Sequence, residues 1–302
     1  MNLLDSTQEA IVRRFTVIAA ALGACALAGC SSSSSSTSTP ASPSATATAS
    51  SPASPSATGS ASSPASPSAA AGASSPASAT GAITVFAAAS LMGTFTQLGK
   101  QFEAAHPGDT VKFSFGPSSG LATEITSGAP ADVFASAAPA NMNTVVKAGD
   151  ASSPQDFAKN TAEVAVPPNN PGQVTSVNDL AKSSVKVALC QPQVPCGVVA
   201  ADVFKNVGIT VKPVTLQPDV KSTLTQVELG NVDAGVVYVT DVKAAGAKVH
   251  GVVIPAGDNA STLYPIDTIN SSTQKSVAEA FVAYVMSPAG QQVLTAAGFQ
   301  KP

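Results

Sequence analysis

The feature that most restricts the folding of this chain is a long stretch, residues 15–99, that contains no Asp, Glu, Lys or Arg. Within it, residues 31–80 are almost entirely Ser, Ala, Pro and Thr, and the pentapeptide Ser-Ser-Pro-Ala-Ser occurs three times. A segment without large apolar side chains cannot bury enough surface to offset the entropy lost on ordering. We therefore expect residues 30–81 to be a disordered tether and folding to be confined to residues 82–302.

The first 29 residues have the order of a secretory signal peptide. The dipeptide Arg13-Arg14 precedes an apolar run, 15–27, which is shorter than the about 20 apolar residues that cross a bilayer. The tetrapeptide Leu-Ala-Gly-Cys that ends at Cys30 resembles the lipobox of bacterial lipoproteins. The sequence thus predicts a signal peptide over residues 1–29, lipidation at Cys30 and an extracytoplasmic location on the outer face of the cytoplasmic membrane. A signal peptide without lipidation, and export by the Sec or the twin-Arg route, stay open.

Charge in the remaining part of the chain disfavours one class of partner. Residues 82–302 contain more acidic residues than lysines and no Arg. Nucleic-acid binding is disfavoured, because the charge balance is acidic and the bidentate guanidinium group is missing. Any anion bound by this part of the chain must also be held without Arg.

From residue 82 onward, strand and helix patterns alternate. Strands are predicted at 83–86, 111–115, 132–135, 185–189, 214–216 and 234–238, and apolar residues have helical spacing over 91–102, 121–125, 199–204, 220–227 and 277–285. Such alternation predicts an α/β fold with parallel sheets. About 220 residues are enough for one sheet or for two lobes.

Small polar residues gather where predicted strands give way to predicted helices. These junctions lie at 88–90, 116–120, 194–197 and 218–220. In open α/β sheets, ligands bind beyond the carboxyl ends of the strands, against the N-termini of the helices that follow. Ser90 and Ser118 offer hydroxyl groups there, and first-turn amides have no acceptor within their helix. Each junction alone fits an ordinary helix cap, but together they predict an anion site built from neutral donors.

These residues resemble a known family, the periplasmic molybdate-binding proteins of ABC importers, which have the type II periplasmic binding protein fold. The resemblance covers essentially all of the folded part and is sharpest at 84–91, 128–137 and 235–238. It implies two lobes, each a mixed, mostly parallel sheet flanked by helices, with a ligand cleft between them. Residues 82–164 and 245–302 would form lobe I, and residues 165–244 would form lobe II.

The resemblance also implies what the protein does and which residues do it. The chain would be a non-catalytic monomer that captures molybdate or tungstate, needs no cofactor and delivers the ion to an ABC permease in the membrane. The oxyanion would be held by the hydroxyls of Ser90, Ser118 and Tyr238 and by the amides of Cys196 and Val220. Pro117 replaces a residue that is often Ser in the family, so one amide donor is lost. If Pro117 displaces Ser118, then Ser119 would be the donor.

Molybdate and tungstate carry no proton at neutral pH, so their site needs hydrogen-bond donors only. Hydrogen phosphate would gain from a carboxylate acceptor. Asp219 is the only acidic residue at the junctions, and we expect it to cap its own helix. Because removing a dianion from water is costly, several charge-assisted hydrogen bonds of about 1.5–3 kcal/mol each must converge on it, and closure of the lobes would bring them together.

Two cysteines of the folded part lie six residues apart. Cys190 and Cys196 could close a small disulfide ring in an oxidising compartment, worth about 2 kcal/mol in the chain-entropy model. Metal binding is the alternative, but His106 and His250 have no metal-site spacing to the pair. The disulfide would stiffen the loop that presents the Cys196 amide.

Two other functions remain to be weighed. Gly116-x-Ser118-x-Gly120 matches the nucleophile elbow of serine hydrolases, and His250 follows it. Against this, the elbow would lie on the second strand, no His-Gly-Gly segment precedes it, and His250 has no evident acidic partner. A surface adhesion or scaffold domain would explain the tether but would leave the four polar junctions unexplained.

Overall fold

The computed structural model describes residues 80–302. The predictions for the signal peptide, for Cys30 and for most of the tether lie outside the described residues. Within residues 80–302, no helix is both long enough and apolar enough to cross a membrane.

Strands and helices alternate along the described residues, so the predicted α/β class is confirmed. The strands are β1 (Ala82–Ala88), β2 (Thr110–Gly116), β3 (Val133–Ala135), β4 (Gln155–Val166), β5 (Val187–Cys190), β6 (Thr215–Gln217), β7 (Ala234–Tyr238), β8 (His250–Val252) and β9 (Ser261–Thr268). The α-helices are α1 (Met92–Ala105), α2 (Ser118–Thr126), α3 (Pro139–Ala148), α4 (Pro195–Val207), α5 (Val220–Glu228), α6 (Val239–Ala245), α7 (Lys275–Met286) and α8 (Pro288–Ala297). Short 3-10 helices are η1 (Ala89–Leu91), η2 (Val177–Ala181) and η3 (Gly246–Lys248).

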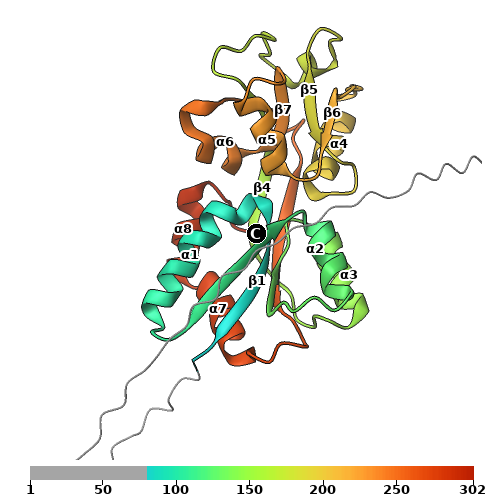
Figure 1. Cartoon of the computed structure of the whole chain (residues 1–302). Helices are drawn as coiled ribbons and strands as arrows, with labels where there is room; N and C mark the ends of the chain where they lie inside the picture. The colour runs from blue at the N-terminus through green and yellow to red at the C-terminus, as the bar shows by residue number, and fades with distance from the viewer. Residues whose placement is uncertain (1–79) are drawn as a thin grey trace, which may run out of the picture. The chain divides into compact units, whose positions relative to one another are not determined.

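The strands form a mixed sheet in the order β2-β1-β3-β9-β4-β7-β5-β6, and β8 also pairs with β4. The long strand β4 joins the two halves of this order. Its residues 155–161 pair with β9, and its residues 162–165 pair with β7. Figure 1 shows β4 running from the part that contains β1, α1 and α7 to the part that contains β5, β6 and β7. Parallel pairing is confined to β1 with β2 and β3, and to β5 with β6 and β7.

Helix α1 shows how an apolar stripe in the sequence fixes the position of a junction. Phe95, Leu98 and Phe102 on its predicted inner face are fully buried. The rings of Phe95 and Phe102 meet Phe281 of α7 edge to face, with centroids 6.1 and 5.4 Å apart. This packing fixes the start of α1, and with it η1 and Ser90, at the carboxyl end of β1.

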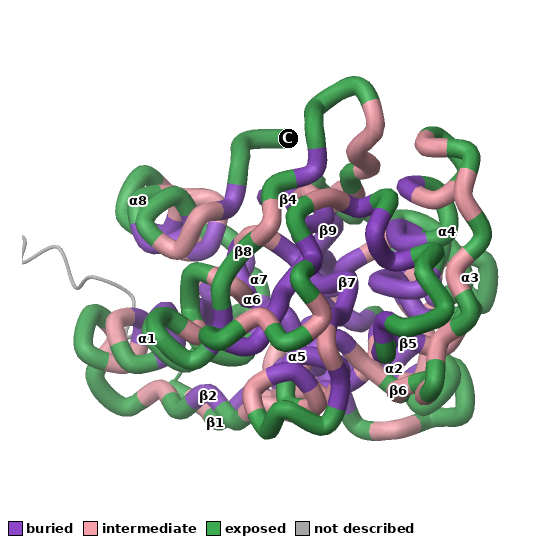
Figure 2. Tube along the Cα trace, turned by 90° about the horizontal axis from the view of Figure 1, so that it is seen from above, coloured by how far each residue is buried: buried purple, intermediate pink, exposed green. Residues whose placement is uncertain are grey.

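Buried apolar residues form separate clusters in the two parts of the sheet. One cluster draws its members from residues 162–254, and the other two draw theirs from residues before 160 and after 263. Figure 2 shows the buried positions along the central strands and the exposed positions on the outer sides of the helices. Val249 and Ile254 belong to the first cluster, so its core extends beyond residue 244, where the sequence places the end of lobe II.

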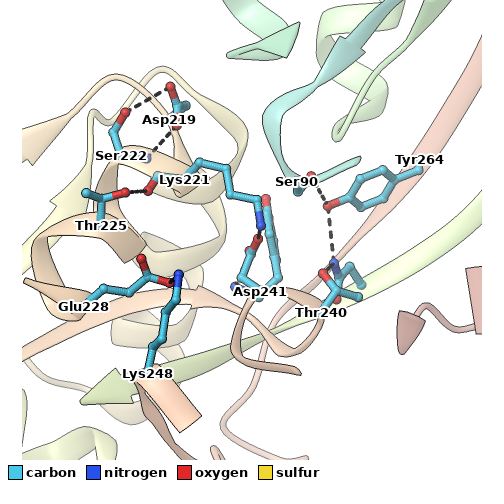
Figure 3. Close-up of polar contacts among 12 residues, drawn as sticks. Ser90, Asp219, Lys221, Ser222, Thr225, Glu228, Thr240, Asp241, Lys248 and Tyr264 are labelled. Atoms are coloured by element: carbon cyan, nitrogen blue, oxygen red, sulfur yellow. Dashed lines mark hydrogen bonds and ion pairs between the residues drawn. The ribbon is translucent and has the colours of Figure 1, made fainter. Parts of the chain in front are cut away.

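An ion pair between a half-buried lysine and a buried carboxylate joins the beginnings of α5 and α6. Lys221 Nζ lies 2.8 Å from Asp241 Oδ1, and the carboxylate of Asp241 is fully buried (Figure 3). The other carboxylate oxygen accepts a hydrogen bond from the backbone N–H of Tyr238 at 3.1 Å. Burial raises the pKa of Asp241, and the Lys221 ammonium opposes that rise. The pair therefore holds two strand–helix junctions in one arrangement.

Removal of the Lys221 charge should leave the Asp241 carboxylate buried and unpaired. We expect Lys221→Met to lower the free energy of unfolding by about 3–5 kcal/mol at neutral pH, as measured by urea denaturation. A pKa raised in the folded state means that the folded protein binds the proton more tightly than the unfolded chain does. Protonation of Asp241 then contributes stability below the ordinary Asp pKa, and this contribution is lost as the pH rises through the raised pKa of the folded protein. The loss of stability in Lys221→Met should therefore shrink on acidification. Adding Asp241→Asn should restore most of the lost stability at neutral pH. If Lys221→Met lowered the free energy of unfolding equally at neutral and at acidic pH, this account would be wrong.

Candidate functional site

A small cavity, with about 20 Å³ open to the centre of a water-sized sphere, lies where strands end and the next helices begin. It is lined by Ala88, Ala89, Ser90, Gly116, Pro117, Ser118, Ala137, Val194, Pro195, Cys196, Asp219, Val220 and Tyr238. The structure thus brings the five predicted ligand residues, Ser90, Ser118, Cys196, Val220 and Tyr238, to one cavity. A space only slightly larger than the ~10–15 Å³ that one water molecule needs on this measure suits a small ion and not a drug-sized ligand.

Ser90 reaches the cavity from the end of β1. It lies in η1 and is buried, and its Oγ is 2.9 Å from the hydroxyl oxygen of Tyr264 on β9. Tyr264 is in turn within 3.4 Å of the Asn160 side-chain amide on β4. The sequence does not point to Tyr264 or Asn160, because neither stands at a predicted junction. Figure 3 shows Tyr264 directed at Ser90.

Ser118 is the first residue of α2 and is 1% exposed. Its Oγ accepts a hydrogen bond from the backbone N–H of Ala137 at 2.9 Å. The preceding Pro117 is extended and has no N–H to offer the cavity. Ser118 lines the cavity and Ser119 does not, so Pro117 leaves Ser118 in place as the candidate donor.

The opposite wall consists of the first turns of α4 and α5. Cys196 and Val220 are buried there, and the first-turn amides of a helix have no acceptor within that helix. The aligned peptides also give each helix start a partial positive charge that favours an anion. Gly197 permits the tight approach of the preceding loop, because a Cβ at this position would collide with the carbonyl oxygen of Gln191.

Cys190 and Cys196 form a disulfide, with their Cα atoms 5.7 Å apart. Cys190 ends β5 and Cys196 lies in the first turn of α4. The bond therefore links the two ends of the loop between β5 and α4. Cys196 lines the cavity and Cys190 does not, so the disulfide supports the cavity wall from behind.

Tyr238 ends β7 and contributes an unsatisfied hydroxyl group. It is 1% exposed, and its hydroxyl oxygen has no hydrogen-bond partner among residues 80–302. Burial raises the pKa of Tyr238 well above its ordinary value, so the phenol keeps its proton. A buried polar group without a partner costs about 1–3 kcal/mol. Because Tyr238 lines the cavity, a ligand with an acceptor atom would supply the missing partner.

The cavity contains one carboxylate, that of Asp219, and this group serves its own helix as predicted. Asp219 Oδ1 accepts from the backbone N–H of Ser222 at 2.8 Å, and Oδ2 accepts from the Ser222 hydroxyl at 3.2 Å. The neighbouring Lys221 is paired with Asp241. Within the described part of the chain, no cluster of three or more His, Cys, Asp or Glu could hold a metal ion. The electrostatic attraction for an anion therefore comes from hydroxyls and helix N-termini.

The geometry does not fit a serine hydrolase. His250 lies on β8, which pairs with the far end of β4, and it is exposed and outside the cavity wall. Ser118 Oγ has a backbone N–H as its neighbour rather than a general base. A nucleophilic serine needs a base within hydrogen-bonding reach.

Comparison with known proteins finds a family model described as bacterial extracellular solute-binding protein, which matches residues 83–300. The molybdate-binding protein ModA of Mycobacterium tuberculosis (strain ATCC 25618 / H37Rv) is 41% identical over 209 residues, which are 69% of this chain and 80% of that protein. A putative ABC transporter substrate-binding lipoprotein, YvgL of Bacillus subtilis, is 32% identical over 67% of this chain and 80% of its own length.

A solved structure agrees with these relatives. The periplasmic molybdate-binding protein of Azotobacter vinelandii superimposes with a TM-score of 0.66 and 26% sequence identity. The match covers 73% of this chain and 99% of that chain. The two-lobed type II periplasmic binding protein fold implied by the sequence is thereby confirmed.

The unsatisfied hydroxyl of Tyr238 leads to a prediction about stability. Tyr238→Phe removes the unpartnered group and keeps the ring, so the free energy of unfolding without ligand should rise by about 1 kcal/mol. Tyr264→Phe, the matched control, removes a hydroxyl that has partners and should lower it by a similar amount. Urea denaturation of both variants measures the difference. Equal losses would mean that the Tyr238 hydroxyl has a partner in solution.

The disulfide leads to a second prediction. Replacing Cys190 and Cys196 together by Ala should lower the free energy of unfolding by about 2 kcal/mol, because the unfolded chain regains the entropy of the closed loop. A reducing agent should destabilise the parent protein by a similar amount and leave the double variant unchanged. Equal sensitivity of both proteins to the reductant would contradict a disulfide between these two residues.

Proposed function

The chain belongs to the bacterial extracellular solute-binding proteins, and from this premise we propose that it binds a fully deprotonated tetrahedral oxyanion, molybdate or tungstate. Proteins of this family bind solutes and are not enzymes. Relatives named as molybdate-binding proteins, at 41% and 31% identity, support the choice of ion. The Bacillus subtilis relative, named as a putative ABC transporter substrate-binding lipoprotein, supports delivery to an ABC transporter permease.

One observation carries the proposal, namely the buried Tyr238 hydroxyl without a partner in a cavity walled by other donors. The oxyanion would accept from the hydroxyls of Ser90, Ser118 and Tyr238 and from the amides of Cys196 and Val220. Each charge-assisted hydrogen bond contributes about 1.5–3 kcal/mol, so five of them together can offset a large part of the cost of dehydrating a dianion. An ion that offers only acceptor atoms matches a wall that offers donors.

The donors come from both parts of the sheet, which supports binding between two lobes. Ser90 and Ser118 follow β1 and β2, whereas Cys196, Val220 and Tyr238 follow β5, β6 and β7. The sequence predicts residues 82–164 and 245–302 as lobe I and residues 165–244 as lobe II. The core clusters shift these bounds, so we place residues 162–254 in lobe II and the residues before 160 and after 263 in lobe I. Closure of such lobes over the ion would display one defined form to the permease.

The proposal extends to residues outside the described part. Cleavage before Cys30 and its lipidation would anchor a monomer to the outer face of the cytoplasmic membrane, and residues 31–79 would connect anchor and folded part. The word lipoprotein in the name of the Bacillus subtilis relative supports this. Labelling of the cells with a fatty-acid analogue should mark the parent protein and not Cys30→Ala.

A calorimetric titration with molybdate, tungstate, sulfate and hydrogen phosphate tests the proposed function. We expect molybdate or tungstate to bind with one ion per protein and to be displaced poorly by sulfate and hydrogen phosphate. Absence of heat with all four ions would favour a scaffold domain. Covalent labelling of Ser118 by a fluorophosphonate would favour a hydrolase.

Single substitutions test the donors. Ser118→Ala and Tyr238→Phe should each weaken molybdate binding by at least about tenfold, the equivalent of one charge-assisted hydrogen bond. Ser119→Ala is the matched control, because Ser119 is adjacent in sequence but does not line the cavity. Its affinity should equal that of the parent protein. An unchanged dissociation constant in Tyr238→Phe would remove Tyr238 from the site.

A further inference from the structure

A chain of buried hydrogen bonds runs behind Ser90. Ser90 Oγ lies 2.9 Å from the hydroxyl oxygen of Tyr264, and Asn160 Nδ2 donates to that same oxygen at 3.4 Å. Asn160 Nδ2 also donates to Thr240 Oγ1 at 2.9 Å. None of the four residues is more than 6% exposed, so water does not replace these partners. Figure 3 shows the chain from Ser90 through Tyr264 toward Thr240.

The orientation of the Asn160 amide fixes the direction of this chain. Asn160 Oδ1 accepts from the backbone N–H of Thr161 at 3.1 Å, and a backbone N–H can only donate. The NH₂ group must therefore face Tyr264 and Thr240, and it too can only donate. Tyr264 accepts from Asn160, so its own proton is available for Ser90. Burial raises the pKa of Tyr264, which keeps that proton in place.

This arrangement allows Ser90 to accept from Tyr264, which would leave its own hydroxyl proton for the cavity. Ser118 shows the same arrangement with a simpler partner, since its Oγ accepts from the backbone N–H of Ala137. In both serines a neighbouring donor can occupy one lone pair of Oγ. Because both serines line the cavity, a hydroxyl proton left over in this way can be donated to an acceptor there.

We propose that Asn160 and Tyr264 are positioning residues that make Ser90 a donor, so that the site discriminates against oxyanions that retain a proton. This inference rests on the proposed function and adds the basis of its selectivity. A protonated oxyanion would need an acceptor in the wall, yet it would meet three hydroxyl protons. The one carboxyl group in the wall, that of Asp219, has both oxygens in hydrogen bonds with Ser222. A buried donor left without an acceptor weakens binding.

The positions of these residues in the sheet suit the role. Asn160 pairs with Thr262 of β9, and two residues later Ala162 pairs with Tyr238 of β7. Asn160 therefore lies where β4 passes from one part of the sheet to the other. From there its amide reaches Tyr264 on β9 and Thr240 on α6 at the same time.

A double-mutant cycle tests whether Tyr264 acts through Ser90. Molybdate affinity is measured by calorimetry for the parent protein, Tyr264→Phe, Ser90→Ala and the double variant. We expect Tyr264→Phe to weaken binding about fivefold in the parent background and less than about twofold in the Ser90→Ala background. In the Ser118→Ala background the fivefold effect should persist. Tyr284→Phe, which removes a hydroxyl bonded to Gln101, should leave the affinity unchanged.

Asn160→Asp tests the direction of the chain with a variant of nearly the same shape. The introduced carboxylate can still accept from Thr161 but would also accept from Tyr264, which reverses the hydrogen bond at Ser90. The ratio of molybdate affinity to hydrogen phosphate affinity should then fall at least about fivefold. Because the two ions carry nearly the same negative charge slightly above neutral pH, repulsion by the added charge largely cancels in the ratio.

The outcomes separate this inference from the proposed function. If the parent protein binds molybdate but Tyr264→Phe has the same effect with and without Ser90, Tyr264 acts through packing and the inference is wrong. An unchanged affinity ratio in Asn160→Asp would also overturn it while leaving oxyanion binding intact. If the parent protein binds none of the four ions, both the proposed function and the inference fail.

Discussion

The cost of dehydrating an anion governs the arrangement of this fold. A small ion with no Arg or free Lys beside it must be met by many neutral donors at once, because each neutral donor compensates only a small part of the lost hydration. Parallel strands meet this need, since their carboxyl ends lie at one edge and each is followed by a helix start with free amides. The cavity at the ends of β1, β2, β5, β6 and β7 is the result.

Bringing donors from two groups of parallel strands together requires a connection between the groups, and β4 provides it. Its antiparallel pairing with β9 on one stretch and with β7 on the next keeps both groups in one sheet. The same strand carries Asn160, whose amide contacts residues of both β9 and α6. The element that connects the two halves of the fold thus also orients one of the hydroxyls at the site. The Lys221–Asp241 pair performs a related task by holding the starts of α5 and α6 together.

The sequence predicts the strands and helices that carry the cavity, because each has a clear apolar period and ends at small polar residues. It does not predict β4 or β9. Polar residues, including Asn160, interrupt the apolar alternation of β4, and Pro265 lies within β9, where a proline argues against a strand. The sequence therefore gives no indication that Tyr264 and Asn160 belong to the site. Their contacts with Ser90 and Thr240 join residues far apart in the chain, and no local pattern encodes such a contact.

Ser118 shows why a motif needs its surroundings before it indicates a function. Within Gly-x-Ser-x-Gly, a serine becomes a nucleophile only when a neighbouring base removes its proton. Here the neighbour is the N–H of Ala137, which can only donate, so the hydroxyl oxygen is an acceptor on that side and keeps its proton. A serine that keeps its proton and directs it into the cavity can hold an anion but cannot attack a carbonyl group. The direction of one hydrogen bond thus separates a binding protein from a hydrolase with the same five-residue pattern.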